Sequence, residues 1–366
     1  MTLTIDPAQL RHLRLRAQGL AAPCTDLTEL LDGAVSLQAQ DYNAAVLGLR
    51  VRSRGLVADD VRAALIDGVL GWTWLMRGTL HLVAMADLPW LLPLFGPEII
   101  RQTARRYREL ALDMDTRGRA TSLLRRILAD GPQTRAALKD KLEAAGLPAE
   151  GQACPYLLRH AALEGVLVCV PLRSSRPHYR LLDDLPTEGW PGVEVTITRL
   201  ARRFLRAFGP ANAADLARWS GLPMPLSRTG LDALAGEVTA VNAAGQRAVM
   251  LNPQLAWLED EPQPGLHLLP AFDALLLSHV ERDPILPAAI SRRIHPGGGI
   301  IRPSLLLDGV VRGRWQLKRS RRSLTIFVTP FVPLPRARLP QLEAEVADVG
   351  RFLGQQATLQ LEAVAA

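Results

Sequence analysis

The sequence predicts an α+β fold, because apolar residues at helical spacing alternate with short strand pairs along most of the chain. The 366 residues are 48% hydrophobic and 22% charged, as in globular proteins with more than one core. No apolar run is long enough to cross a bilayer, and the N-terminus lacks the basic and apolar regions of a secretory signal. We therefore expect a cytoplasmic protein without membrane association.

The clearest unit of the predicted fold lies between residues 116 and 190. Helices are predicted over 120–131, 136–145 and 156–164, and a glycine ends or follows each one. A strand over 166–170, a basic turn over 173–176 and a second strand over 178–181 come next. Three helices followed by a two-stranded wing is the order of a winged-helix module.

Two further modules of this kind are predicted. Residues 191–262 contain a helix over 197–208, a helix capped by Asn212 and Asp215 that ends near Gly221, and a helix near 226–234. Their wing consists of strands over 238–241 and 248–251. Residues 1–115 carry the faintest copy, a helix over 60–66 followed by a hairpin over 72–83.

The last part of the chain, residues 263–366, has a different pattern. Strands are predicted over 266–278, 304–312, 313–318 and 324–328, and a helix over 339–353 closes the segment. This pattern predicts a small C-terminal domain that resembles a β-barrel.

The net charge of +7 favours an anionic partner, and only three of the 43 basic residues are lysines. Arginine is the better bidentate partner for phosphate, although a GC-rich genome also encodes it freely. The three cysteines form no CxxC pair, and the seven histidines show no spacing typical of a metal site. We expect neither a metal nor another cofactor.

Three short motifs occur in order: Leu37-Gln38-Ala39-Gln40, WLMRGTLH from Trp74 to His81, and LPAFD from Leu269 to Asp273. Together they resemble the winged-helix DNA glycosylases, the family of the azinomycin-resistance enzyme AlkZ, over nearly the whole chain. The resemblance implies three tandem winged-helix modules and a C-terminal β-barrel-like domain that form a C-shaped basic channel. It also implies a monofunctional glycosylase acting on bulky N7-alkylguanine or on interstrand crosslinks, which the family unhooks.

The family's glutamine–aliphatic–glutamine motif maps onto Gln38 and Gln40, with Ala39 in the aliphatic position. The chemistry also fits two amides. An N7-alkylated guanine already carries positive charge, so it leaves without prior protonation, and amides can orient a water near C1′ of the sugar. We expect Gln38 and Gln40 to be catalytic. The alternative is that both amides only hydrogen-bond to backbone.

Candidate DNA-binding residues come from the basic positions. Alternation would place Arg77 and His81 on one hairpin face with Thr79. Either Arg77 and His81 contact phosphates or the lesion, or the face is simply polar and its histidine is structural. Arg101, Arg105 and Arg108 on a helix over 98–111, and Arg199, Arg203 and Arg206 on the 197–208 helix, form two stripes. The densest basic run is 312–322, in which Trp315 and Leu317 face inward. The glycine tip of 292–302 enters a minor groove or is a mobile surface loop. The full set is Arg77, His81, Arg101, Arg105, Arg199, Arg203, Arg293, Arg302, Arg314, Lys318 and Arg319.

Asp273 follows an aromatic residue in an apolar segment, so we expect it to be buried and hydrogen-bonded rather than catalytic. A lyase reaction is not expected, because Lys139 and Lys141 lie on a predicted solvated helix and no Schiff-base nucleophile is evident.

The predicted function is thus a monomeric glycosylase acting on double-stranded DNA with alkylated purines, in self-resistance to a DNA-alkylating natural product. The alternatives are a winged-helix transcriptional regulator and a non-catalytic binder of damaged DNA. The sequence leaves the alkyl adduct open.

Overall fold

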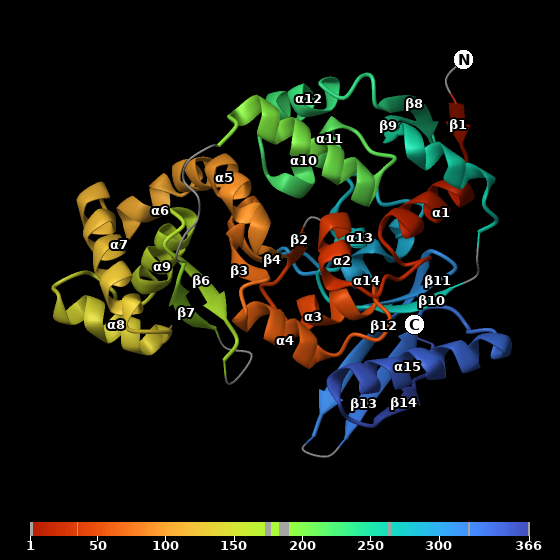
Figure 1. Ribbon diagram of the computed structural model, residues 1–366. Helices are drawn as coiled ribbons and strands as arrows, with labels where there is room; N and C mark the ends of the chain where they lie inside the picture. Colours follow the sequence, from red (N-terminus) through yellow and green to blue (C-terminus); the bar gives the residue numbers. More distant parts are fainter. Residues whose placement is uncertain are drawn as a thin grey trace. The chain divides into compact units, whose positions relative to one another are not determined.

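The computed structural model describes residues 3–34, 36–172, 177–182, 190–262, 265–320 and 323–364. The chain forms two compact units, which we call the discontinuous unit (1–61 and 198–366) and the middle unit (62–197). Their helices and strands are labelled in Figure 1. The predicted basic turn over 173–176 and the arginines at 321 and 322 lie outside the described residues. Within the described ranges, no helix is long and apolar enough to span a membrane.

The middle unit opens with the predicted hairpin. Strand β3 (Leu70–Leu75) pairs antiparallel with β4 (Thr79–Ala84), from Leu70 opposite Ala84 to Leu75 opposite Thr79. The helix predicted over 98–111 is instead two helices, α5 (Leu88–Gln102) and α6 (Ala104–Glu109). They separate at Thr103, whose hydroxyl donates to the Ile99 carbonyl at 2.6 Å and competes with the helical backbone bond.

The next segment of the middle unit has the predicted three helices and hairpin. Its elements are α7 (Met114–Ala129), β5 (Gln133–Thr134), α8 (Arg135–Ala144), α9 (Ala153–Leu163), β6 (Leu167–Val170) and β7 (His178–Leu181). Leu138 and Leu142 of α8 are buried, as their spacing predicts. Because β7 pairs with β5, and β6 pairs with β3, these strands run in the order β4-β3-β6-β7-β5. Figure 1 labels the first four of them.

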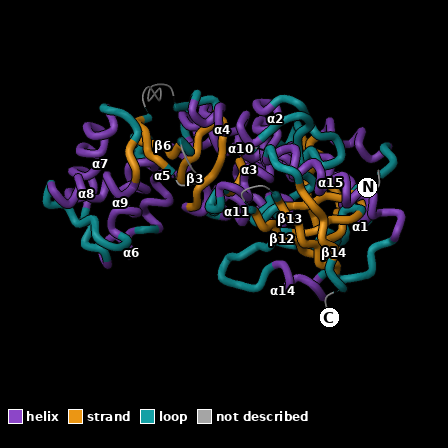
Figure 2. The backbone as a smooth tube through the Cα atoms, turned by 90° about the horizontal axis from the view of Figure 1, so that it is seen from below, coloured by secondary structure: helices purple, strands orange, loops and turns teal. Residues whose placement is uncertain are grey.

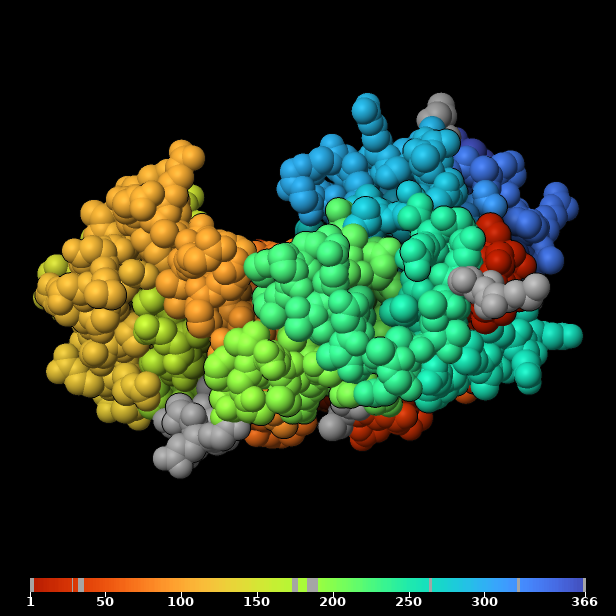
Figure 3. Space-filling view, turned by 90° about the horizontal axis from the view of Figure 1, so that it is seen from above, coloured from red at the N-terminus to blue at the C-terminus, as the bar shows by residue number. Residues whose placement is uncertain are grey.

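The second helix–hairpin segment consists of α10 (Val193–Phe208), α11 (Ala213–Ser220), α12 (Met224–Asp232), β8 (Val238–Ala243) and β9 (Gln246–Leu251). The predicted cap of α11 is confirmed: the Asn212 side chain accepts from the Asp215 backbone N–H, and the Asp215 carboxylate accepts from the Asn212 N–H. Gly221 ends the helix in the left-handed conformation. Residues of this segment cover much of the discontinuous unit's surface in the view of Figure 3 (green to teal).

The N-terminal residues of the discontinuous unit form β1 (Leu3–Ile5), α1 (Pro7–Ala17), α2 (Leu27–Ala34), β2 (Ser36–Gln38) and α3 (Tyr42–Arg50). Helix α4 (Ala58–Ile66) follows and contains the boundary between the units. Strand β1 pairs in parallel with β8, with Leu3 opposite Val241, a pairing that the sequence analysis did not predict.

The C-terminal segment is a mixed sheet with helices. Its elements are β10 (Leu266–Leu269), α13 (Ala274–Leu277), α14 (Ser291–Ile294), β11 (Ser304–Leu307), β12 (Val310–Arg319), β13 (Leu324–Pro330), α15 (Leu339–Leu353) and β14 (Ala357–Leu361). The strands run in the order β10-β11-β12-β13-β14, and β12, β13 and β14 lie together in Figure 2.

The predicted barrel is wrong, because the described strands form an open sheet with β10 and β14 at its edges. Helix α15 packs against both edge strands. Its apolar side chains Leu342, Val346 and Val349 are buried, so a helix covers the face that a barrel would close upon itself. The strand predicted over 266–278 ends at Leu269, because Asp273 caps helix α13.

Candidate functional site

The Gln-Ala-Gln motif begins at Gln38, the last residue of β2, and Ala39 and Gln40 lead from this strand toward α3. Leu37 and Ala39 are buried, at 3% and 0% exposure, whereas Gln38 is partly exposed and Gln40 is exposed. Successive side chains of extended backbone point to opposite sides. The two amides therefore share the accessible side of the segment, while Leu37 and Ala39 anchor it.

Helix α3 fixes the position of this segment. Asp41, directly after Gln40, accepts from the Ala44 N–H at 3.1 Å and caps the helix. Gly48 of the same helix faces the motif: a Cβ there would lie 3.6 Å from Leu37 Cδ1 and 3.8 Å from Pro270 Cγ. The first and third sequence motifs thus meet on the surface of α3.

A buried ion pair joins Arg52, two residues after the end of α3, to the third motif. Arg52 donates from Nη1 and Nη2 to the two carboxylate oxygens of Asp273, at 2.8 Å each. The Arg52 side chain is 2% exposed and that of Asp273 is 0% exposed. Arg52 also donates to the Gly48 carbonyl at 3.0 Å and to Gln18 Oε1 at 2.9 Å. The expectation that Asp273 has a buried hydrogen-bonding role is confirmed.

A second buried arginine holds the end of the same helix. Arg50 donates to Glu345 at 3.0 Å and to Asp348 at 2.9 Å, both on α15, and to the Leu268 carbonyl at 3.2 Å. The sequence analysis missed Arg50 and Arg52. The available signal was that two arginines end a helical run that is otherwise apolar, where a charge must find a partner.

The hairpin of the middle unit places Arg77 and His81 differently from the prediction. Arg77 lies in the turn Met76–Gly78 with a φ of 55°, so it does not share a strand face with Thr79 and His81. His81 is buried, and its Nδ1 lies 2.9 Å from the Thr79 carbonyl oxygen. Burial, with a smaller contribution from the positive Arg77, lowers the pKa of His81 to about 3. A buried, neutral imidazole offers no positive charge to a phosphate.

His81 is expected to make the protein less stable in acid. The unfolded chain binds a proton at this histidine below about pH 6.5, whereas the folded chain does so only near pH 3. The contribution of neutral His81 is therefore fully present above about pH 6.5, and the free energy of unfolding decreases as the pH falls through this window. Urea unfolding between about pH 7.5 and 5 measures the slope. The His81→Asn variant should show a shallower dependence of the unfolding free energy on pH. An unchanged slope would mean that His81 is not the cause of the acid sensitivity.

The predicted stripe on residues 98–111 is divided between two helices. Arg101 of α5 is exposed and pairs with Glu98 at 2.6 Å, and Arg105 of α6 is exposed and pairs with Glu109 at 2.8 Å. Exposed pairs of this kind contribute little to stability, so either arginine can exchange its carboxylate for a phosphate at small cost.

The predicted stripe on α10 loses its middle residue. Arg199 is exposed, but Arg203 is only 8% exposed and donates from Nη2 to the Leu31 carbonyl at 3.0 Å. Arg203 therefore connects α10 to α2 instead of facing solvent.

Of the two β12 residues predicted to face inward, Trp315 is buried and Leu317 is only partly buried, while Arg319, which has the same alternation as both, is exposed. Trp315 is buried and donates from its indole to the Leu269 carbonyl at 2.7 Å, whereas Lys318 and Arg319 are exposed and Arg314 is partly exposed. Lys318 Nζ lies 4.7 Å from the centre of the Phe327 ring.

The glycine tip of 292–302 is a tight turn. Gly297 and Ile300 form an isolated antiparallel bridge, and the glycines at 297–299 all have positive φ. Arg302 is exposed and donates to the Arg293 carbonyl at 3.2 Å, while the Arg293 guanidinium lies 5.0 Å from the Phe331 ring centre. Insertion of this tip into a groove stays a prediction.

The family model "DNA glycosylase AlkZ-like" matches residues 31–352 of this chain. The chain belongs to the AlkZ-like DNA glycosylases. A relative from Streptomyces sahachiroi, named an interstrand DNA cross-link repair glycosylase, is 26% identical over 344 residues, 87% of this chain and 88% of the relative. The structure of the DNA glycosylase AlkZ from Streptomyces sahachiroi matches with a TM-score of 0.79 at 24% identity, covering 98% of this chain and all of AlkZ.

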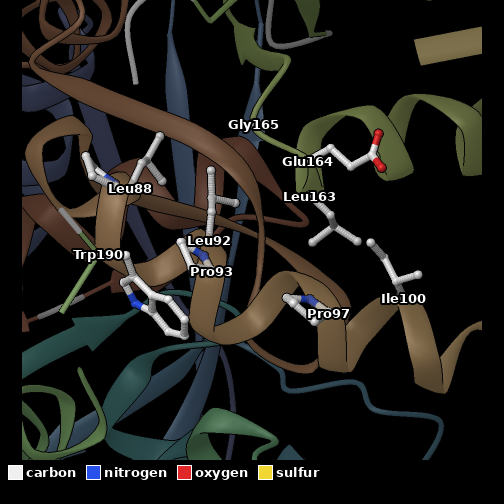
Figure 4. Close-up of a pocket in the computed structure, with 10 residues that line it drawn as sticks. Leu88, Leu92, Pro93, Pro97, Ile100, Leu163, Glu164, Gly165 and Trp190 are labelled. Carbon is white, nitrogen blue, oxygen red and sulfur yellow. The ribbon is translucent and has the colours of Figure 1, made fainter. Parts of the chain in front are cut away.

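The AlkZ-like chain also has an apolar pocket in its middle unit, with a volume of about 500 Å³ (Figure 4). Leu88, Leu92 and Pro93 of α5 line it beside Trp190. The charged side chain at its edge, Glu164, accepts a hydrogen bond from Thr121 at 3.1 Å and faces His160 at 3.3 Å. Among the described residues, no cluster of His, Cys, Asp and Glu is suited to a metal ion.

Two neighbouring arginines of α10 allow a matched test in this AlkZ-like protein. If Arg199 contacts a phosphate, as its place in the stripe predicts, Arg199→Ala should weaken binding to every duplex and reduce the slope of log affinity against log salt by about 1. Arg203→Ala should instead lower the free energy of unfolding by about 1–3 kcal/mol, because the Leu31 carbonyl loses its donor. Fluorescence anisotropy and urea unfolding separate the two effects. A loss of stability in Arg199→Ala, or a change of salt slope in a stable Arg203→Ala, would contradict these predictions.

Proposed function

We propose that this protein is a monofunctional DNA glycosylase that releases bulky N7-alkylguanine from DNA and unhooks interstrand crosslinks. The observation that carries the proposal is the placement of Gln38 and Gln40 on one accessible side of an anchored segment, in a member of a DNA glycosylase family. The name of the Streptomyces sahachiroi relative, which specifies interstrand cross-link repair, supports the substrate.

In the proposed reaction the electron pair of the glycosidic bond leaves with the base and neutralises the positive charge of the alkylated purine. Water adds its oxygen to C1′ of the resulting oxocarbenium-like sugar, and its proton passes to solvent. The amide oxygens of Gln38 and Gln40 accept hydrogen bonds from that water, while the amide N–H groups donate to the abasic sugar. No general acid is needed, since the leaving base is already cationic.

We propose that residues 1–115, 116–190 and 191–262 are three winged-helix modules and that they form a C-shaped basic channel with residues 263–366. The order of three helices and a hairpin supports the second and third modules. The residues proposed to contact DNA phosphates are Arg77, Arg101, Arg105, Arg199, Arg293, Arg302, Arg314, Lys318 and Arg319. His81 and Arg203 are left out because they are buried.

A lyase step is not part of the proposal. Hydrogen bonds to Glu150 and Glu143 raise the pKa of Lys139, so this amine stays protonated and is not a nucleophile. We further propose that the protein acts in the cytoplasm as a monomer and gives self-resistance to a DNA-alkylating natural product. A transcriptional regulator or a non-catalytic binder would bind DNA without base release, and the family does not favour either.

The test uses a duplex crosslinked through N7 of guanine and a matching duplex with a single N7 adduct. The protein should convert the crosslinked species to separate strands on a denaturing gel, and alkali should then cleave the abasic site. Without alkali the strands should stay whole, because no lyase step occurs. An unmodified duplex and heat-inactivated protein are the controls. A shift in mobility without base release would overturn the proposal in favour of a binder.

A further inference from the structure

A pocket of about 450 Å³ with both charged and apolar lining residues lies in the discontinuous unit, and neither Gln38 nor Gln40 lines it. Its walls come from α1, from the residues that follow α1 and α3, from β10 and from the turn between β11 and β12. The charged side chains in these walls are Arg11, Arg54, Arg338 and Asp308.

Positive charge is in excess in this pocket. Asp308 is already engaged, since its carboxylate accepts from Arg338 Nη2 at 2.7 Å and from the Gly265 N–H at 3.0 Å. The described parts of the chain provide no ion pair for Arg11 or Arg54. Two arginines therefore line one pocket without a carboxylate of their own among the described residues, and a bound anion could neutralise them.

Two histidines of the same pocket, His12 and His267, do not add to this charge. Burial is the main cause that lowers the pKa of each, so both imidazoles are neutral near pH 7. Affinity for an anion must come from the arginines.

The fold holds Arg11 in place. Gly309, in the turn between β11 and β12, has a φ of +76° and packs directly on α1. A Cβ at this glycine would lie 3.2 Å from Arg11 Cβ and 3.1 Å from Leu15 Cδ1. The aliphatic stem of Arg11 is thus packed against the turn, while Leu15, Leu20 and Pro23 give the pocket an apolar wall.

We propose that this pocket binds the phosphate group of a nucleotide, with Arg11 and Arg54 as its partners and the apolar wall against the sugar or base. Guanidinium groups match phosphate oxygens in geometry and charge, and the volume falls in the range of small-ligand sites. The phosphate ester comes from a free nucleotide or from a DNA strand. The second source rests on the proposed function, because it makes the pocket a further contact with substrate DNA.

The test compares two double variants of the full chain. Arg11→Ala with Arg54→Ala removes the proposed partners. Arg16→Ala with Arg202→Ala is the control, because it removes the same charge from residues that pair with Asp260 and Glu237 outside the pocket. Calorimetry measures binding of deoxyguanosine monophosphate and of deoxyguanosine, and anisotropy measures binding of an unmodified duplex against salt.

If the ligand is a free nucleotide, deoxyguanosine monophosphate should bind the wild type and deoxyguanosine should not. The Arg11→Ala, Arg54→Ala variant should then lose roughly tenfold or more in affinity for the monophosphate, while the control variant should keep its affinity. If the phosphate belongs to a DNA strand, the slope of log duplex affinity against log salt should decrease by about 2 in the pocket variant relative to the control. Equal behaviour of the two variants with both probes would overturn the pocket proposal. Base release from crosslinked DNA is measured in a separate assay. Absence of base release would contradict the glycosylase proposal, whereas equal ligand binding by the two variants would contradict the pocket proposal.

Discussion

Replacing Gln38 and Gln40 together by alanine is expected to lower the rate of base release by roughly 10²–10⁴-fold, to the limit of detection in most assays. The two amides share the accessible side of their segment, and the proposed water has no other ligand from this motif. Affinity for the crosslinked duplex should change little, because uncharged amides add nothing to phosphate attraction. Single-turnover gel assays with excess protein report the chemical step apart from binding.

The single variants separate chemistry from folding. Gln40 is exposed, so Gln40→Ala should leave the free energy of unfolding within about 0.5 kcal/mol of the wild type. Gln38 is partly buried, and Gln38→Asn keeps its polar group while shortening its reach. Gln102→Ala is the control, since Gln102 is an exposed amide on α5 that bonds to Glu98. Full base release by a folded double variant would remove both glutamines from the mechanism.

Sequence alone predicted the features whose causes lie within a few residues. The cap of α11 is an example, because Asn212 and Asp215 satisfy each other's backbone within one turn and Gly221 supplies the left-handed end. The β3–β4 hairpin followed from alternation, as did the inward direction of Trp315. These features do not depend on the rest of the chain.

Features that depend on distant residues were predicted wrongly or missed. Alternation showed that β12 has an inner face, but not that α15 would cover the sheet and leave it open. The arginine stripe predicted that Arg203 lies on a solvent-facing side of α10. The side chain is instead buried and donates to the Leu31 carbonyl of α2. A periodic pattern identifies which residues share a face and contains no information about what covers that face.

The candidate site shows the same division. Gln38 and Gln40 were found from a local motif, whereas the ion pair that holds their segment joins residues 52 and 273, which are 221 positions apart. Phe272, directly before Asp273, has a φ of 58°, a conformation that bulky residues rarely adopt and that requires support from its surroundings. The third motif is thus explained by what it does for α3 rather than by chemistry of its own.

Asp273→Ala is therefore expected to cost about 3–5 kcal/mol of unfolding free energy, the largest stability loss among the variants considered. The substitution leaves the guanidinium of Arg52 buried without its carboxylate and removes the cap of α13. Urea unfolding followed by circular dichroism measures the loss. Glu237→Ala is the control: its ion pair with Arg202 is exposed, at 46% and 44% for the two side chains, so this variant should lose little stability.

A double variant shows whether the buried charge is the cause. Replacing both partners, as in Arg52→Met with Asp273→Leu, should recover part of the stability, because no uncompensated charge remains. Base release should stay low in this double variant, since the bonds from Arg52 to the Gly48 carbonyl and Gln18 are lost and α3 no longer holds the segment of Gln38 and Gln40 in one position. Recovery of stability with full base release would mean that the ion pair only stabilises the fold and does not position the two amides.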